Sequence, residues 1–195
     1  MNSTTYTVLT ETEMIKLHLG CGSKNFGNEW THVDGGGYDH LDGADITKLK
    51  FKDRSVDIIY ASHVFEYFDR EKAVSVLNEW FRVLKGGGIL RIAVPDFYQI
   101  SKLYIQGEYP LQNFLGPLYG KMNMSKEAIY HKTVYDFFSL STLLQSVGFD
   151  SVKKYNWRDT EHSNVDDCSQ AYLPHMDKEN GTLISLNVEA SKCLT

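Results

Sequence analysis

Two glycines and one carboxylate carry the clearest chemical signal in the sequence. Gly20 and Gly22 come directly after the largely apolar run 14–19, and Asp34 comes directly after the next such run, 30–33. Glycine has no Cβ, so the backbone can turn sharply after a strand and a ligand can lie against it. A carboxylate at the end of the following strand is placed to accept hydrogen bonds from both ribose hydroxyls of an adenosine. The pattern predicts a site for an adenosine-containing cofactor.

Asn25 distinguishes between two classes of such cofactors. A dinucleotide-binding turn has a third glycine where this chain has Asn25. Asn25 and Phe26 would also hinder the close helix packing that a pyrophosphate site needs. A cofactor with ribose but without phosphate fits better, and S-adenosylmethionine is such a cofactor. An NAD-dependent nucleotide-sugar oxidoreductase is the less favoured alternative.

Some histidine and aspartate residues are candidates for removing a proton from the acceptor of a transferred group. Methyl transfer to a hydroxyl is helped by a general base, and histidine is the usual choice because it titrates near neutral pH. We predict His131 and Asp96 as catalytic residues, and His63 as a residue of the cofactor-site floor. Asp96 can instead simply cap the element that follows it. The scattered His and Asp side chains show no spacing typical of a metal site.

The elements that must position these residues alternate along the first half of the chain, which argues for a mostly parallel sheet. The pattern predicts strands at 14–19, 30–33, 56–61, 89–94, 152–157 and 183–190, with helices at about 69–85 and 139–148. Asp69 suits the N-cap of the first helix, and Gly86 to Gly88 are expected to end it. We expect one domain over 1–195.

Three segments fall outside this alternation. Residues 1–13 are polar and are expected to form a loose leader. The aromatic-rich stretch 97–135 predicts a helical insertion or lid, whose aromatic side chains are core or a dimer face. The polar loop at about 158–181 is either solvated or folded over the site, where it would bring polar and aromatic groups to a polar acceptor: Arg158, His162, Asp166, Asp167, Tyr172 and His175.

Composition excludes several classes of protein. The chain has 195 residues and a net charge of −5, without a Lys/Arg cluster, so a nucleic-acid partner is disfavoured. Its three cysteines are scattered, which indicates neither a disulfide framework nor a zinc site. We see no signal peptide and no apolar run near the roughly 18 residues of a membrane span. We therefore expect a cytoplasmic protein that does not contact a membrane.

Four short motifs, in order, resemble those of class I S-adenosylmethionine-dependent methyltransferases. They are Leu17–Gly22; Asp45-Ile46 with 49–51 and 53–57; Ala61–Glu66; and Arg82–Gly88. The resemblance covers roughly residues 14–96. It implies a Rossmann-like, three-layer αβα fold with a mostly parallel seven-stranded sheet whose last strand is antiparallel.

The resemblance also implies which residues bind S-adenosylmethionine. They are Leu19, Gly20, Cys21, Gly22, Asp34, Asp45, Ile46, Ser62 and His63. The glycine turn would lie under the methionine and ribose part of the cofactor, and Asp34 would hold the ribose. Asp45 would hydrogen-bond the adenine amino group, with Ile46 packing on the ring. Ser62 and His63 would line the floor beside the sulfonium.

Some positions depart from the family pattern. The family often has an acid where His18 stands, glycine where Lys24 stands, and histidine where Tyr67 stands. The whole chain is also similar to predicted methyltransferases of glycan biosynthesis. We therefore expect methyl transfer to a small polar or carbohydrate-type acceptor, at oxygen, by a possible homodimer. The alternative is a cofactor-binding but inactive interaction module.

Overall fold

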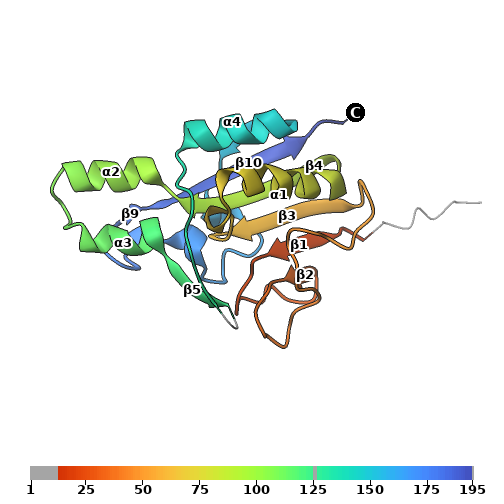
Figure 1. Cartoon of the computed structure of the whole chain (residues 1–195), viewed down its shortest axis with the longest axis horizontal. Helices are drawn as coiled ribbons and strands as arrows, with labels where there is room; N and C mark the ends of the chain where they lie inside the picture. Colours follow the sequence, from red (N-terminus) through yellow and green to blue (C-terminus); the bar gives the residue numbers. More distant parts are fainter. Residues whose placement is uncertain (1–12, 125–126, 195) are drawn as a thin grey trace, which may run out of the picture.

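The structure, a computed structural model, describes residues 13–124 and 127–194 of the chain (Figure 1). Nearly all of the predicted leader lies outside these residues. Six strands form the main sheet, in the order β2-β1-β3-β4-β10-β7. Their bounds are β1 Lys16–Leu19, β2 Trp30–Val33, β3 Val56–Ser62, β4 Leu84–Pro95, β7 Phe149–Lys154 and β10 Ser185–Lys192.

Strand direction follows the expected plan. β1, β2, β3 and β4 are parallel, and β10 runs antiparallel to both of its neighbours, β4 and β7. The mostly parallel sheet with an antiparallel last strand is therefore confirmed. Within the described residues, the main sheet has six strands rather than seven: beyond the β2 edge, only an isolated parallel bridge joins Val33 to Gly43.

Two helices cover one face of the sheet. These are α1 (Arg70–Val83) and α4 (Phe137–Val147), which lie side by side above the sheet in Figure 1. Ala73, Val76, Leu77 and Trp80 of α1 are completely buried, as the helical spacing of these residues predicts. They join the inward side chains of the central strands in the main core.

The ends of these helices show where local signals succeeded and failed. Asp69 caps α1 by accepting a hydrogen bond from the Lys72 amide (2.8 Å), as predicted. The prediction that Gly86 to Gly88 end α1 is wrong, because the chain passes directly from Val83 into β4. The glycines lie inside β4, at a bulge where the pairing with β3 shifts and Gly87 has a φ of +78°.

The opposite face has no helical layer within the described residues. The connection 20–29 between β1 and β2 forms turns only, and so does most of 34–55. An aromatic stack covers this face instead: Phe26 lies between the rings of His18 (3.8 Å) and His162 (4.2 Å), beside Trp30 and Tyr60. The expected αβα sandwich is thus helical on one side only, because both connections run as turns and irregular chain.

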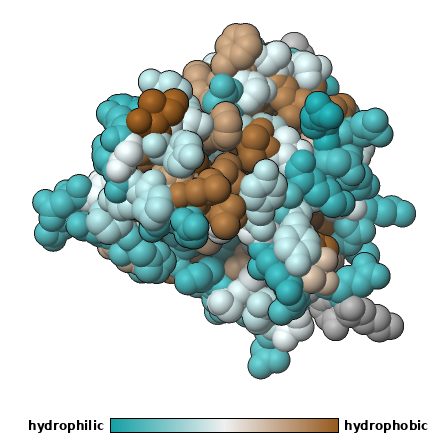
Figure 2. Space-filling view, turned by 60° about the vertical axis from the view of Figure 1, so that its left-hand side comes forward, coloured by the Kyte–Doolittle hydropathy of each residue, from teal (hydrophilic) through white to brown (hydrophobic). Residues whose placement is uncertain are grey.

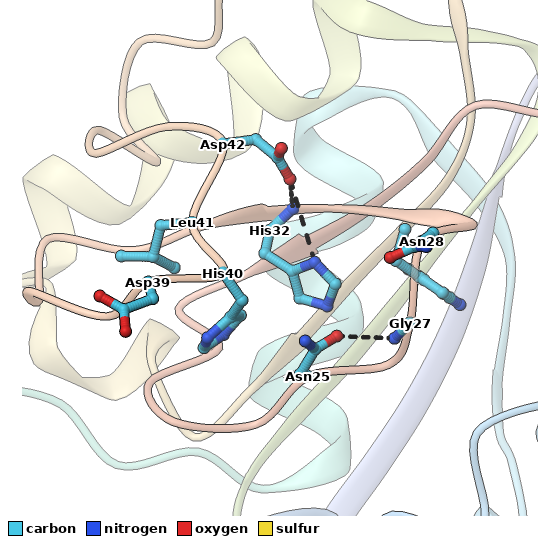
Figure 3. A pocket seen from close by; sticks show the side chains of 9 residues that line it. Asn25, Gly27, Asn28, His32, Asp39, His40, Leu41 and Asp42 are labelled. Atoms are coloured by element: carbon cyan, nitrogen blue, oxygen red, sulfur yellow. Dashed lines mark hydrogen bonds and ion pairs between the residues drawn. The ribbon is translucent and has the colours of Figure 1, made fainter.

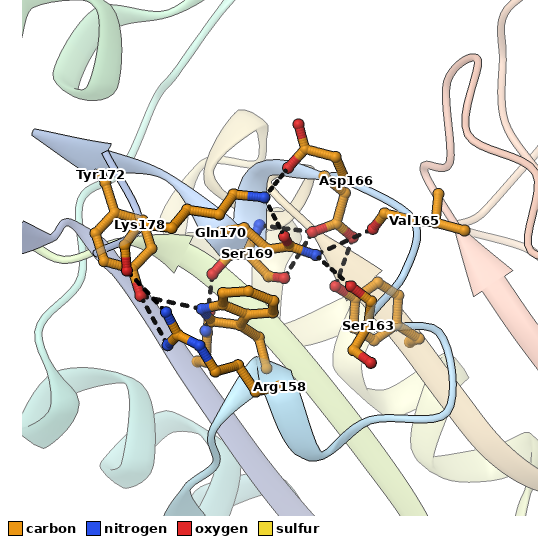
Figure 4. A network of polar contacts seen from close by, with 12 residues as sticks. Arg158, Ser163, Val165, Asp166, Ser169, Gln170, Tyr172 and Lys178 are labelled. Carbon is orange, nitrogen blue, oxygen red and sulfur yellow. Dashed lines mark hydrogen bonds and ion pairs between the residues drawn. The ribbon is translucent and has the colours of Figure 1, made fainter. Parts of the chain in front are cut away.

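The polar loop 155–184 completes this second face. Tyr60 donates a hydrogen bond from its hydroxyl to Asp167 (2.6 Å), and Asn187 donates one to the Ser169 carbonyl (2.9 Å). Within the loop, Arg158 contacts Tyr172, and Lys178 bonds both Asp166 and Gln170 (Figure 4). The loop is fastened to the sheet and to itself, so most of its predicted polar groups have partners within the protein.

The insertion 97–135 contains two helices and a hairpin. They are α2 (Phe97–Ile105), α3 (Gln112–Tyr119), β5 (Lys121–Met124) and β6 (Glu127–Tyr130). Helices were expected here, but the hairpin was not. The insertion lies beyond the carboxyl ends of the parallel strands, on the side that Figure 2 brings forward, where apolar side chains gather among polar ones. Among the described residues, none of the helices is long and apolar enough to cross a membrane.

We predict that Phe26→Ala destabilises the fold by about 3 kcal/mol, because it opens the stack between two buried imidazole rings. Urea unfolding measures the change. Phe138→Ala is the matched control, since Phe138 is 78% exposed and its loss is expected to cost less than about 0.5 kcal/mol. Equal losses in the two variants would contradict a structural role for the stack.

Candidate cofactor and acceptor site

One cavity, of about 390 Å³, collects several of the predicted cofactor residues. It lies at the carboxyl ends of β1 and β2 and is closed by the segment after β3 and by the β5–β6 hairpin. Its lining residues are Gly20, Asp34, Gly35, Ala44, Asp45, Ile46, Thr47, Val64, Tyr67, Phe68, Lys72, Met122, Ile129 and Lys132. The volume is in the range of small-molecule sites, which is roughly 300–1,000 Å³.

The glycine turn forms one wall of this cavity. Gly20 has a φ of +66°, and a Cβ at this position would collide with the side chain of Val64. Its amide donates to the Val33 carbonyl (2.8 Å), which joins the turn to the end of β2. A glycine is therefore required at position 20 for two reasons, backbone conformation and space.

Asp34 connects the turn to the loop after β2. Its Oδ2 accepts from the Gly22 amide (2.9 Å) and its Oδ1 accepts from the Gly36 amide (2.7 Å). The residue is 8% exposed and lines the cavity. Each carboxylate oxygen has two lone pairs, so each can still accept one hydroxyl proton. The carboxylate thus fits a ribose with two adjacent hydroxyls.

Asp45 and Ile46 form a second wall. Asp45 Oδ1 accepts from the amide (2.8 Å) and the hydroxyl (2.7 Å) of Thr47, and these bonds lower the pKa of the Asp45 carboxyl. The Ile46 carbonyl accepts from the Trp80 indole (2.8 Å), which fixes this segment against α1. The Ile46 side chain is left half-buried at the cavity, where it offers an apolar surface to a flat ring.

Other predicted cofactor residues lie outside the lining. Leu19 is completely buried in the main core. The Cys21 thiol lies 3.8 Å from His40 Nε2, and burial raises its pKa to about 12. Gly22 contributes its amide to Asp34. Ser62 has a buried hydroxyl without a hydrogen-bond partner, and His63 turns away toward Ser185.

Another cavity, of about 380 Å³, lies beside β2 and is distinct from this site (Figure 3). His32, His40, Asp39 and Asp42 contribute to its polar lining. Two hydrogen bonds fix His32 in this position. Its backbone amide donates to Asp42 Oδ2 (2.8 Å), and its Nε2 accepts from the Phe26 amide (2.9 Å). This cavity contains neither the glycine turn nor Asp34.

Comparison with known proteins agrees with the geometry of the first cavity. Residues 37–92 match the model of a methyltransferase domain. This segment includes Asp45, Ile46, α1 and most of β4. The match covers the middle of the chain and is a similarity to that domain.

The chain has the fold of S-adenosylmethionine-dependent methyltransferases.

Solved structures of methyltransferases share the fold of this chain. A methyltransferase from Archaeoglobus fulgidus is 16% identical with a TM-score of 0.54, and the match covers 92% of this chain and 86% of that one. A Burkholderia thailandensis 1,6-didemethyltoxoflavin N1-methyltransferase, solved with S-adenosylhomocysteine, is 12% identical over 92% and 71% of the two chains, with a TM-score of 0.51.

A third structure is a complex between a Haloferax volcanii methyltransferase and its Trm112 activator. It is 15% identical over 95% of this chain and 84% of that one, with a TM-score of 0.54. The comparison with curated proteins finds no significant match.

A smaller cavity, of about 240 Å³, adjoins the cavity that contains the glycine turn. Lys132 contributes to both. Its other lining residues are Phe97, Leu118, Tyr119, His131, Thr133 and Val134. The structure therefore places the predicted base, His131, in a compartment next to the cofactor cavity. Asp96 lines neither cavity; its Oδ1 caps α2 by accepting from the amides of Tyr98 (3.1 Å) and Gln99 (3.3 Å).

Behind His131 lies an acid that the sequence analysis did not assign. Glu66 is 0% exposed, and neither of its carboxyl oxygens has a hydrogen-bond partner. Its Oε1 lies 3.4 Å from His63 Nδ1 and 3.7 Å from His131 Nε2. Burial raises the pKa of Glu66 to about 8 and lowers that of His63 to about 3. In the sequence, the one feature that could have indicated this buried acid is its position inside the otherwise apolar run Val64–Phe68.

The hydrogen bonds around the two imidazoles show which nitrogens carry protons. His131 Nδ1 lies 2.9 Å from the Pro117 carbonyl, which only accepts, so Nδ1 donates and Nε2 is bare in the neutral ring. The Ser185 hydroxyl donates to Asn187 Oδ1 (2.9 Å), so His63 Nε2 must donate to Ser185 (2.9 Å) and His63 Nδ1 is bare. Glu66 thus faces two bare nitrogens.

We predict that Glu66→Gln stabilises the fold increasingly as the pH rises. The pKa of Glu66 is raised on folding from 4.5 to about 8, so the folded wild type loses stability relative to the unfolded chain between these two values. Glutamine does not ionise, and its amide can donate to a bare imidazole nitrogen. The difference in unfolding free energy between the variants should grow by about 2–3 kcal/mol from pH 5 to 7.5.

Urea unfolding at the two pH values measures this, and His63 titration largely cancels because both variants contain it. A constant difference would show that Glu66 is already ionised in the fold.

Proposed function

We propose that this protein is an S-adenosylmethionine-dependent methyltransferase and that it transfers a methyl group to a hydroxyl of a small polar or carbohydrate-type acceptor. The observation that supports this most is the pair of adjoining cavities, one with the adenosine-binding features and one lined by His131. Open α/β sheets bind ligands at the carboxyl ends of their strands, which is where both cavities lie.

The cofactor cavity fits S-adenosylmethionine. Asp34 would accept hydrogen bonds from the ribose hydroxyls, and Gly20 lets Val64 pack against the turn at the wall of the cavity. Ile46 would pack on the adenine, and Asp45 would accept from its amino group. Met122 and Ile129 of the hairpin give the same cavity an apolar cover. The connection 20–29 contains no helix, so it provides no helix N-terminus for a pyrophosphate, which disfavours NAD.

When bound, S-adenosylmethionine supplies an electrophilic methyl group: the acceptor oxygen bonds the methyl carbon as the carbon–sulfur bond breaks and its electrons remain on sulfur. The chain has two tasks in this reaction. It aligns the acceptor, which can contribute up to roughly 7–11 kcal/mol in ideal cases. It also removes the hydroxyl proton, for which His131 is the candidate.

The second cavity supports a small hydroxylated acceptor. Phe97 and Tyr119 give it aromatic walls, and His131 and Thr133 give it polar atoms. Tyr119 and Phe97 are 66% and 43% exposed, so the compartment opens to solvent at this side. Its volume admits one sugar-sized group and not a large polymer segment.

The inactive interaction module is the competing proposal. The Haloferax volcanii methyltransferase of this fold is found in a complex with an activator. Here, α2 and α3 expose Tyr104, Ile105, Leu111 and Leu115, a surface on which a protein partner or a second copy could dock. Release of S-adenosylhomocysteine with any member of a panel of sugars and nucleotide sugars excludes the inactive module.

We predict that Asp34→Ala raises the dissociation constant for S-adenosylmethionine by about 10- to 150-fold, equivalent to roughly 1.5–3 kcal/mol for hydrogen bonds to a charged group. Calorimetry measures it, after thermal unfolding has shown that the variant is folded. Asp39→Ala is the matched control, because Asp39 is an exposed acid of the same loop outside the cofactor cavity. Unchanged affinity in Asp34→Ala would remove Asp34 from the ribose site.

We predict that His131→Ala lowers the rate of methyl transfer by about 100-fold while the affinity for S-adenosylmethionine stays the same. Single-turnover kinetics and calorimetry separate the two effects. His175→Ala, which removes an exposed histidine of the polar loop, should leave both unchanged. A normal rate in His131→Ala would reject His131 as the base.

A further inference from the structure

We propose that Glu66, together with His63 and His131, forms a cluster that takes up the proton of the acceptor hydroxyl, and that Glu66 sets the pH dependence of methyl transfer. This inference rests on the proposed function, in which His131 is the base. Glu66 lines neither cavity and acts only through His131, so it is a positioning residue.

The cluster lacks a proton donor between its three groups. His63 Nδ1 and His131 Nε2 are both bare and lie 3.4 and 3.7 Å from Glu66 Oε1. In this arrangement an ionised Glu66 faces two lone pairs in a completely buried position. A single added proton converts one repulsive contact into a hydrogen bond, so the cluster has a high affinity for one proton. No group of His, Cys, Asp and Glu in the described residues, this one included, is arranged to hold a metal ion.

Hydrogen bonds fix the segment of Glu66 relative to the segment of His131. The Glu66 carbonyl accepts from the amides of Lys132 (2.8 Å) and Thr133 (3.2 Å), which fastens the His131 segment to the segment after β3. Thr133 also donates its hydroxyl to the Phe68 carbonyl (2.9 Å). The base and the acid behind it are therefore fixed to each other although they are far apart in sequence.

The active cluster has Glu66 ionised and both facing nitrogens bare. The acceptor O–H bond breaks, its electron pair stays on the oxygen that takes the methyl group, and the proton goes to His131 Nε2, whose lone pair is not engaged in a hydrogen bond because Glu66 Oε1 is 3.7 Å away. The positive imidazole and the negative carboxylate then share this proton, and the cluster becomes neutral. Water removes the proton before the next turnover.

The other ionisable groups that face Glu66 titrate at higher pH. Burial raises the pKa of Tyr67 and of Tyr135 to about 12 and that of the Cys168 thiol to about 11. Burial lowers the pKa of both histidines. A transition near pH 8 therefore belongs to Glu66. Because the active form is the ionised one, the rate should rise with pH and level off above this value.

The test compares the pH–rate profile of the wild type with that of Glu66→Gln. The variant removes the titrating group and donates an amide proton to His131 Nε2. We expect it to lose the transition near pH 8 and about 100-fold of the rate above that pH, with unchanged affinity for S-adenosylmethionine. Glu66→Asp should keep a transition, since it keeps the acid. Glu71→Gln, an exposed acid on α1, is the matched control and should behave as wild type.

A second readout is independent of activity and of the identity of the acceptor. The NMR resonances of the His131 ring should shift with a midpoint near pH 8 in the wild type and show no such midpoint in Glu66→Gln. The same transition in both variants, in kinetics or in NMR, would overturn the assignment to Glu66. Failure of the wild type to bind S-adenosylmethionine would instead refute the proposed function, and calorimetry distinguishes the two cases.

Discussion

The carboxylate of Asp34 is the group on which the geometry of the cofactor site depends. The glycine turn after β1 leads into no helix within 20–29, so no helix dipole or helix packing holds it. Asp34 holds it instead, by accepting from Gly22 on one oxygen and from Gly36 on the other. The same carboxylate offers its remaining lone pairs to the cavity. One side chain thus both holds the turn and faces the cavity. A change of Asp34 is therefore expected to alter the shape of the turn as well as the charge in the cavity.

The missing helical layer explains an unusual residue in the glycine motif. His18 occupies a position where related enzymes often have an acid, and here it lies 1% exposed in a stack against Phe26. Burial lowers the pKa of His18 to about 2, so it is neutral in this apolar layer. An ionised acid at this position would lie against an aromatic ring without a cation. Residue 18 therefore stabilises the second face and is not available to a ligand.

Glu66 contrasts with His18, because at position 66 the fold does contain a buried acid, and its burial lowers the stability of the fold. Its position between two imidazoles that both present lone pairs stabilises the protonated acid at neutral pH. Buried groups with shifted pKa values gather at functional sites more often than elsewhere. Here the acid lies directly behind the histidine of the acceptor cavity. Its location and its proton affinity are two consequences of the same burial.

The sequence by itself determined the local features of this protein. The β2 boundaries, the Asp69 cap and the buried stripe of α1 follow from contacts within a few residues, where propensity and periodicity act. It also placed Gly20 and Asp34 at one site, because strand ends of a parallel sheet meet at one edge, while Asp45 and Ile46 were assigned from the family resemblance. Tertiary structure decided the rest. Gly86 to Gly88 entered a strand because β3 offered pairing partners, and Asp96 became a helix cap.

The contact between Glu66 and His131 forms only in the tertiary structure, because the two residues are 65 positions apart in the sequence and no local pattern predicts such a contact.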